Sequence, residues 1–457
     1  MKICAIILTL FLCAFLRRDF LMSTFTDSYK VPELRKKMWF TFLILSVLAL
    51  LSLIPVPGID RAGASAAIAK WGDTGVLLDV MSFKALGNVS ITSLGLYPFL
   101  IASIVMQILT IAVPRLHNIA QSGDAGAKII QKFTRSAAVV ADVVFALLYC
   151  VGMRNHIWNS INYWVAICLA GLCLAAGAAF FGWCVELINN KGVGSGLVIV
   201  ILACIIRDIP VHFKNLYVKA SVLGVPAAAA LTFAGAVVAL ALFVFVIWFN
   251  LGGKKLHILF SKRTVGMKQY GMQNQIIPLR VAQAGTMPIV YSIAIMLLPA
   301  TVITLVMPED TTNIFLLGIV NFKRSVSFYI LYVFFTATFS YIFSMIQFNP
   351  LEMSNQIKQN SGYIQGLRPG KPTAQYLITL CRNLNLADAA FLIIVSLLPM
   401  LLDLIPVMNG IWFSGIICLM IGGGLIELKL FMENAIAAEE EKAKAASKDR
   451  KKNKYAK

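Results

Sequence analysis

Side chains that could bind metals or act as nucleophiles are sparse in this sequence, and they lie far apart. The nine cysteines include no CxxC pair, and most lie inside apolar runs, where cysteine behaves as a small apolar residue. The four histidines are distant from one another, and neither HExxH nor GxSxG occurs. The sequence therefore predicts no cofactor, no metal site, no disulfide framework and no enzymatic activity.

Acidic residues are also scarce inside the apolar segments. Glu186 and Glu427 lie near the ends of predicted membrane helices. Ionisable groups at the middle of a membrane usually mark proton relays or substrate sites. Their scarcity argues against a proton-coupled transporter.

Glycine and proline interrupt the apolar segments at three places, residues 93–103, 191–200 and 283–292. A broken membrane helix usually lines a cavity, because its freed backbone groups need water or protein partners. Close helix packing through small residues is the alternative interpretation of each break. The bulky aliphatic residues that follow the three breaks favour a pathway through the membrane.

The elements that must position these breaks are membrane helices. Of the 457 residues, 59% are hydrophobic and 13% charged, about half the charged fraction of a soluble domain. A membrane span takes roughly 20 apolar residues, and such segments recur, so we expect an all-α integral membrane protein with about ten membrane helices. The predicted spans are 38–54, 94–114, 136–153, 163–185, 196–210, 226–249, 284–306, 326–348, 388–405 and 411–431.

Charge predicts the orientation of these helices. The chain has 40 Lys and Arg against 21 Asp and Glu, and alternate loops hold most of the basic residues. Basic loops stay in the cytoplasm, which predicts that both termini are cytoplasmic. Nucleic acid is a weaker explanation of the charge, with ribosomal RNA as the exception.

The ten predicted spans form two groups of five, and the first helix of each group crosses the membrane in the opposite direction. This arrangement suggests an inverted repeat.

Residues 72–87 are too short and too charged to span the membrane. The expected divisions are a leader at 1–37 with an alternative start at Met22, a first half at 38–210 containing 72–87, a second half at 211–432 with large cytoplasmic loops at 250–283 and 349–387, and a charged tail at 433–457.

Several stretches, in order and spacing, closely resemble the SecY family, the channel subunits of the Sec protein translocon, from about Lys30 to Glu433. They are VPELRKKMWF (31–40), LIPVPGID (53–60), LGLYPFLIASIVMQIL (94–109), FGWCVELINNKGVGSG (181–196), IPLRVAQAGTMP (277–288), LLPATV (297–302) and FNPLEMSNQIKQNSGYIQGLRPGKPTAQYL (348–377).

The resemblance implies a clamshell of two inverted five-helix halves around an hourglass pore, through which unfolded preproteins cross the membrane. A short helix, here 72–87, would plug the pore. An aliphatic ring would close its waist, since an apolar constriction excludes ions by dewetting. By the resemblance, the ring comprises Leu96, Leu100, Val193, Leu197, Val290 and Met420.

The resemblance also implies a lateral gate and a cytoplasmic binding site. The gate lies between the second and seventh spans, releases transmembrane segments into lipid, and has Gln107 at its polar position. Arg368 matches the family's loop arginine that contacts the motor and the ribosome. Lys254 and Lys255 stand where the family usually has a pair of arginines, and the resemblance implies the same motor and ribosome contact for them. Lysine, however, lacks the planar fork with which arginine binds acidic groups.

The implied partners are SecE-like and SecG-like small membrane subunits, a SecA-like ATPase motor, the ribosome, preprotein substrates and membrane lipid. The expected location is the cell (inner) membrane, with the plastid thylakoid membrane as the alternative. A secondary transporter with an inverted-repeat fold is the other function that the interrupted helices suit. A compact polar site at the membrane midplane would favour it, and the sequence shows none.

Overall fold

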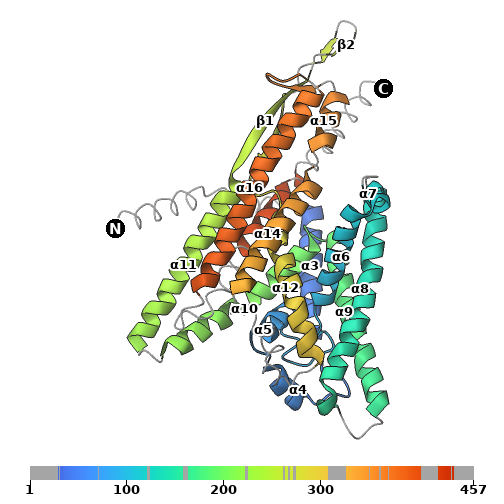
Figure 1. Cartoon of the computed structure of the whole chain (residues 1–457), viewed down its shortest axis with the longest axis vertical. Helices are drawn as coiled ribbons and strands as arrows, with labels where there is room; N and C mark the ends of the chain where they lie inside the picture. The colour runs from blue at the N-terminus through green and yellow to red at the C-terminus, as the bar shows by residue number, and fades with distance from the viewer. Residues whose placement is uncertain are drawn as a thin grey trace. The chain divides into compact units, whose positions relative to one another are not determined.

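The structure is a computed structural model of the chain, which is mostly helical (Figure 1). It describes residues 29, 31–69, 71–120, 124–157, 163–221, 225–260, 263–265, 268–270, 274–306, 326–348, 350–359, 362–368, 370–402, 420–433 and 435–436. Most of the predicted leader, the tail beyond residue 436 and the first part of the span predicted at 411–431 lie outside these residues. The last residues of the predicted leader are described, and a helix begins there at Pro32.

The chain forms two compact units. Unit 1 takes in Lys214–Ser292 and Tyr329–Ile426, and unit 2 takes in Phe15–Phe213, Ile293–Phe328 and Glu427–Lys457. Each unit therefore combines segments that are distant in sequence.

Unit 2 contains the helices of the N-terminal half. In chain order they are α3 (Pro32–Leu51), α4 (Arg61–Ala69), α5 (Gly72–Met81), α6 (Tyr97–Ala112), α7 (Pro114–Ala120), α8 (Asp124–Gly152), the 3-10 turn η1 (Arg154–His156), α9 (Tyr163–Lys191) and most of α10 (Gly196–Ala220). α8 packs against both α6 and α9, and α9 also packs against α3 (Figure 1).

Proline determines where two of these helices begin and where one is broken. Pro32 begins α3 and Pro98 lies in the first turn of α6, positions at which the missing N–H has no helical partner to lose. Pro114 follows the end of α6, and the chain bends there by 102° into α7. The helix of the second predicted span therefore ends at Ala112, and α6 and α7 form a bent pair.

Unit 1 contains α11 (Val225–Leu251), the first turn of α12 (Met287–Val306), most of α14 (Val326–Gln347), α15 (Pro350–Gln359) and α16 (Lys371–Leu402). Residues 420–433 form a further helix, which the boundary between the units divides. The aromatic ring of Tyr291 on α12 packs against Phe339 and Phe343 on α14.

The loop predicted at 250–283 contains strands, which the sequence analysis did not anticipate. β1 (Gly253–Phe260) pairs antiparallel with β4 (Asn274–Arg280) and with β5 (Gly362–Ile364), in the order β4-β1-β5. β2 (Arg263–Val265) and β3 (Lys268–Tyr270) pair separately.

The segment predicted as a loop at 349–387 is instead mostly regular structure. It contains α15, β5 and the first part of α16. Residues 371–387 are too polar to be read as a span, but their apolar side chains recur at helical spacing. Leu377 on α16 is fully buried with Ile258 of β1 and Ile357 of α15 in one apolar core. α16 therefore begins well before the predicted span at 388.

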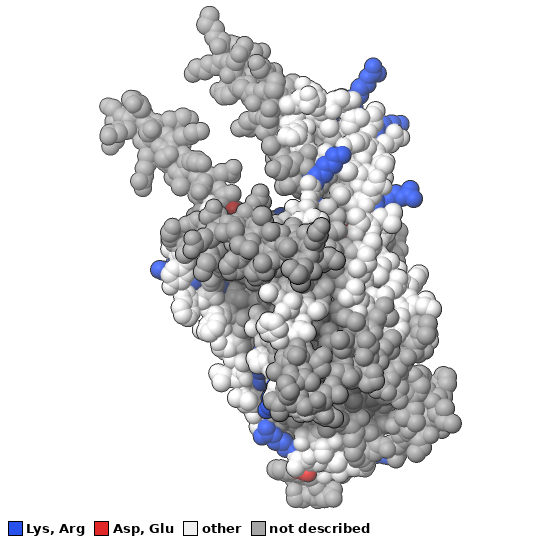
Figure 2. Space-filling view, turned by 90° about the vertical axis from the view of Figure 1, so that its left-hand side faces the viewer, with Lys and Arg blue, Asp and Glu red and all other residues white. Residues whose placement is uncertain are grey.

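By length and composition, five described helices could cross a membrane, or six if α6 and α7 form one bent span. Only 11% of the apolar window of Phe233–Leu251 is buried, so that helix presents its apolar side chains to its surroundings. Trp164 is 76% exposed and Leu172 is 72% exposed, as expected for lipid-facing positions. Figure 2 shows a face whose visible charge is almost all Lys and Arg. The count of ten spans stays a prediction.

The packing of α9 generates a stability prediction. A β-carbon on Gly177 would collide with the backbone carbonyl of Ile91, whereas one on Gly171 would meet only the Cys150 sulfur at 3.7 Å. Gly177→Ala should therefore destabilise the folded protein by about 1–3 kcal/mol, because overpacking forces the backbone to shift. Gly171→Ala is the matched control on the same helix. Thermal unfolding in mild detergent should show a lower midpoint for Gly177→Ala only, and equal midpoints would contradict the packing described.

Candidate functional site

The break between α9 and α10 is held by side chains that bind its backbone N–H groups. The N–H of Val193 donates to Thr41 Oγ1 at 3.2 Å, and the N–H of Gly196 donates to Asn189 Oδ1 at 2.6 Å. Gly194 has a φ of +69°, a conformation that suits glycine. Thr41 lies on α3, so the break is tied to a helix that is distant in sequence.

The break before α12 is held in the same way within unit 1. The N–H of Ala284 donates to Asp388 Oδ2 of α16 at 2.9 Å, and Asp388 is fully buried. The Ser344 hydroxyl of α14 contacts Gln283 Oε1 at 3.0 Å and also Asn385 Oδ1. A carboxylate placed just before a helix N-terminus also suits the helix dipole.

The break predicted at 93–103 begins in the last part of the turn between α5 and α6, residues 82–96, and this turn has a strained backbone. Phe83, Lys84 and Val89 have φ values of +56°, +57° and +51°, which non-glycine residues rarely adopt and which cost about 1–3 kcal/mol each. Gly95 has a φ of +55° and lies against Ser82, where a side chain would not fit. Such a turn persists only if its surroundings hold it.

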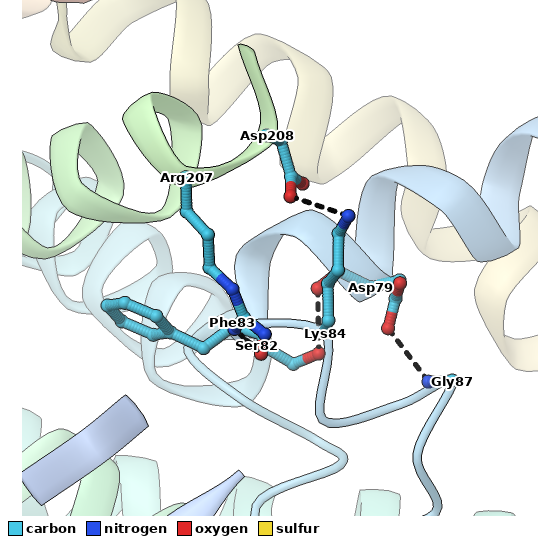
Figure 3. A network of polar contacts seen from close by, with 7 residues as sticks. All are labelled: Asp79, Ser82, Phe83, Lys84, Gly87, Arg207 and Asp208. Atoms are coloured by element: carbon cyan, nitrogen blue, oxygen red, sulfur yellow. Dashed lines mark hydrogen bonds and ion pairs between the residues drawn. The ribbon is translucent and has the colours of Figure 1, made fainter. Parts of the chain in front are cut away.

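The middle of α10 holds this turn through Arg207 and Asp208 (Figure 3). The ammonium of Lys84 lies 3.0 Å from Asp208 Oδ1, and the Arg207 guanidinium donates to the carbonyl oxygen of Phe83. Asp208 is 3% exposed in its side chain and Lys84 is 30% exposed, so the pair is largely removed from water.

Asp79 closes the turn from the α5 side. Its Oδ1 accepts the N–H of Gly87 at 2.7 Å, and the carbonyl of Asp79 accepts the N–H of Lys84 at 2.8 Å. Burial raises the pKa of the Asp79 carboxyl, and the Gly87 N–H opposes that rise. The segment predicted at 72–87 is thus a short helix, α5, followed by a turn anchored at both ends.

The residues predicted for the pore ring are all buried. In unit 2, Leu96 and Leu100 are fully buried at the start of α6, joined by the hydrogen bond from the Leu100 N–H to the Leu96 carbonyl at 3.0 Å. Leu197 is 6% exposed in the first turn of α10. In unit 1, Val290 on α12 and Met420 are buried too.

Val193 differs in setting from its predicted neighbour Leu197. Val193 lies in the turn before α10, which begins at Gly196, whereas Leu197 lies in the first turn of that helix. Its side chain packs in an apolar cluster with Leu34 and Met432. The ring assignment of Val193 remains a prediction.

Helices α6 and α12 meet at a residue that the sequence analysis did not single out. The hydroxyl of Tyr97, the first residue of α6, donates to the carbonyl oxygen of Ala294 on α12 at 3.0 Å. The Thr301 hydroxyl lies 3.4 Å from the Tyr97 hydroxyl oxygen. Gln107, the residue predicted for this seam, lies half-buried on α6.

Two buried acids also escaped the sequence analysis. Asp142 on α8 is 2% exposed and Asp388 on α16 is fully buried, and both lie inside helices long and apolar enough to span. The sequence analysis described acids inside the apolar segments as scarce and named only Glu186 and Glu427, so it passed over these two. Asp142 could have been found from the sequence, because it lies inside the span predicted at 136–153. Asp388 could not, because it is the first residue of the span predicted at 388–405, whereas in the structure it lies in the middle of α16.

The predicted cytoplasmic contact residues lie on the body formed by the sheet, α15 and α16. Arg368 is exposed in the turn between β5 and α16, where its carbonyl accepts the Thr373 hydroxyl at 2.8 Å. Lys254 is exposed on β1, with its ammonium 5.7 Å from the centre of the Tyr376 ring. Lys255 pairs through its backbone with Pro278 of β4.

Comparisons with known proteins agree with this fold. The SecY family model matches residues 90–428. A protein translocase subunit SecY from Halalkalibacterium halodurans is 32% identical over 384 residues, which are 82% of this chain and 88% of that protein.

Solved channel structures share the fold at low sequence identity. A chain described as a protein conducting channel aligns with a TM-score of 0.57 at 16% identity, over 88% of this chain and 90% of that one. Sec61 in the canine ribosome-channel complex aligns with a TM-score of 0.55 at 16% identity, over 86% and 92%. The fold is therefore that of the SecY and Sec61 channels, and the protein is a multi-pass membrane protein.

The particular family follows from the sequence matches. The family model covers about three quarters of the chain, and the Halalkalibacterium halodurans relative covers most of it. This chain belongs to the SecY family.

The anchored turn after α5 generates a second prediction. Lys84→Met should leave Asp208 buried without its cation and destabilise the seating of α5 by about 3 kcal/mol, because one partner of a buried ion pair is removed. Limited proteolysis should then cut within residues 82–96 faster than in the unchanged protein. The double variant Lys84→Met with Asp208→Leu removes both charges and should be cut more slowly than Lys84→Met. Equal cleavage of all three proteins would show that the ion pair does not hold the turn.

Proposed function

Within the SecY family the chain is a protein-conducting channel, and we propose that it passes unfolded preproteins across the membrane and releases transmembrane segments sideways into lipid. The observation that carries the proposal is the position of Leu96, Leu100 and Leu197. Each is a buried aliphatic residue at the start of a helix that follows a break. Bulky apolar side chains there suit a constriction that excludes ions by dewetting and yields to any passing sequence.

α5 and its anchored turn supply the plug in this proposal. α5 has ten residues, about 15 Å at 1.5 Å per residue, so it is too short to span. The turn after α5 is attached to the middle of α10 by polar contacts, beside buried apolar side chains such as Leu78 and Phe83. Polar contacts of this kind can be exchanged for water when a chain enters, at lower cost than repacking an apolar core.

The lateral gate in this proposal lies between α6 and α12. Both helices begin directly after a break, and both are apolar along their length. Pro299 inside α12 removes one backbone hydrogen bond, which makes a helix easier to bend. A seam made of such helices suits a path through which a segment leaves for the lipid.

The partners are part of the proposal. The solved Sec61 relative is described in a complex with a ribosome. The exposed Arg368 and Lys254 suit a partner that carries carboxylates or phosphates. We propose that the body formed by the sheet, α15 and the first part of α16 faces the cytoplasm and binds a SecA-like motor or a ribosome. SecE-like and SecG-like subunits accompany the chain. The protein lies in the inner membrane of the cell, with both termini in the cytoplasm.

The transporter alternative gains one observation, the buried acids Asp142 and Asp388. Ionisable residues inside a membrane often mark substrate sites. Asp388, however, already accepts a backbone N–H at the start of α12, which gives it a structural task. The two acids also lie in different units. The family membership favours the channel.

The ring generates a third prediction. Replacing Leu96 and Val290 together with Asn should hydrate the constriction, raise the resting ion conductance of reconstituted channels and permit export of a preprotein with a defective signal. Leu174→Asn on α9 is the control, because Leu174 is fully buried outside the predicted ring. It should lower stability without raising the conductance per folded channel. Unchanged conductance and signal selection in the double variant would remove these residues from the ring.

The cytoplasmic turn generates a fourth prediction. Arg368→Glu should abolish motor-driven export, and Arg368→Lys should reduce it, because only the guanidinium binds an acidic group with a planar fork. Loss of a central interface residue costs about 2 kcal/mol or more in affinity. Export of a model preprotein into vesicles with equal amounts of each variant is the measurement. Lys128→Glu on α8, an equally exposed charge reversal, is the control. Near-normal export by Arg368→Glu would exclude this turn from the binding site.

A further inference from the structure

The seam between α6 and α12 contains a buried phenol that joins the two helices. Tyr97 is 2% exposed, and its hydroxyl donates to the carbonyl oxygen of Ala294 at 3.0 Å. The Tyr97 ring packs edge-to-face on Phe145 of α8, with 5.5 Å between ring centres. The ring is therefore fixed by α8 while its hydroxyl reaches α12.

The acceptor side of this contact lies where α12 is easiest to deform. Pro299 has no N–H, so the carbonyl of Ile295 loses its helical donor, and Ala294 is the residue before it. The Thr301 hydroxyl donates to the Leu297 carbonyl at 2.7 Å and lies 3.4 Å from the Tyr97 oxygen. Both polar contacts of the phenol thus fall on the turns around the proline.

Separating α6 from α12 would break this hydrogen bond in surroundings that offer few replacements. Tyr97 lines one small cavity whose other residues are mostly apolar. They are Leu78, Leu86, Leu94, Pro98, Phe145 and Leu305, with Trp71, Ser93, Tyr149 and Thr301. A buried hydrogen bond contributes little net free energy when it forms, but a donor left without a partner in an apolar site is costly. An aliphatic residue at position 97 would impose no such penalty.

We propose that the Tyr97 hydroxyl is a polar tie across the lateral gate that determines how apolar a signal segment must be to open it. This inference rests on the proposed function, because it takes α6 and α12 as the gate. A signal segment that enters the seam breaks the tie, and only a sufficiently apolar segment gains enough contact with lipid and with the helices to offset the loss.

Tyr97→Phe tests the tie, since it removes one oxygen atom and leaves the ring on Phe145. In reconstituted vesicles, Tyr97→Phe should increase the export of a preprotein with a weakened signal about fivefold, the effect of losing one buried hydrogen bond. Export of a preprotein with a strong signal should change by less than about twofold, because that signal already opens the gate. Thr301→Val should act in the same direction with a smaller effect.

Tyr149→Phe is the matched control. Tyr149 is fully buried on α8, contacts the Trp71 ring and lines the same cavity as Tyr97, but it belongs to neither α6 nor α12. Tyr149→Phe should leave signal selection unchanged. Equal selection in Tyr97→Phe and the unchanged protein, or an equal change in Tyr149→Phe, would overturn the tie.

Hydrogen–deuterium exchange separates this inference from the proposed function. Amides of residues 293–306 should exchange faster in Tyr97→Phe than in Tyr149→Phe or the unchanged protein, whether or not the protein transports anything. Faster exchange in a protein that exports no preprotein would support the contact and contradict the channel function. Unchanged exchange together with unchanged signal selection would contradict the tie and leave the channel function intact.

Discussion

Every backbone N–H and C=O inside a membrane must have a partner, and this constraint shapes the whole of the described chain. Continuous helices meet it internally, but the three breaks cannot. At each break a polar side chain from elsewhere supplies the partner: Thr41 for Val193, Asp388 for Ala284 and Asp79 for Gly87. Each break is therefore tied to a particular neighbouring segment, which positions the aliphatic residues next to it.

The same constraint explains why polar residues are buried in so apolar a chain. Asp388 is fully buried because the start of α12 needs an acceptor, and Asp208 is buried because the strained turn after α5 is anchored through Lys84. The two contacts differ in kind. A hydrogen bond from a backbone N–H positions a helix start permanently, whereas an ion pair with a partly exposed lysine can exchange for water. That difference suits a fixed gate helix and a removable plug.

The sheet, α15 and the first part of α16 follow the rules of soluble domains. Leu256, Ile258 and Leu377 form a buried apolar core, while Lys254 and Arg368 are exposed. The burial alternates along β1 and β5, which is the pattern of a sheet that faces water on one side. α16 leads from this core into an apolar helix. α16 is thus one continuous helix that connects the body carrying Lys254 and Arg368 with Asp388, which binds the start of α12.

The sequence by itself determined the membrane helices, the three breaks and the family, because hydropathy, glycine and proline act locally and the motifs occur in order along the chain. It could also propose Leu96, Leu100 and Arg368 as functional residues through the resemblance. Only the tertiary structure showed that Val193 packs against Leu34, that Tyr97 contacts Ala294, and that Asp388 binds the start of α12. These contacts join residues about 100 to 200 positions apart. A hydrogen-bond partner at that separation is chosen by helix packing, which no local pattern of residues specifies.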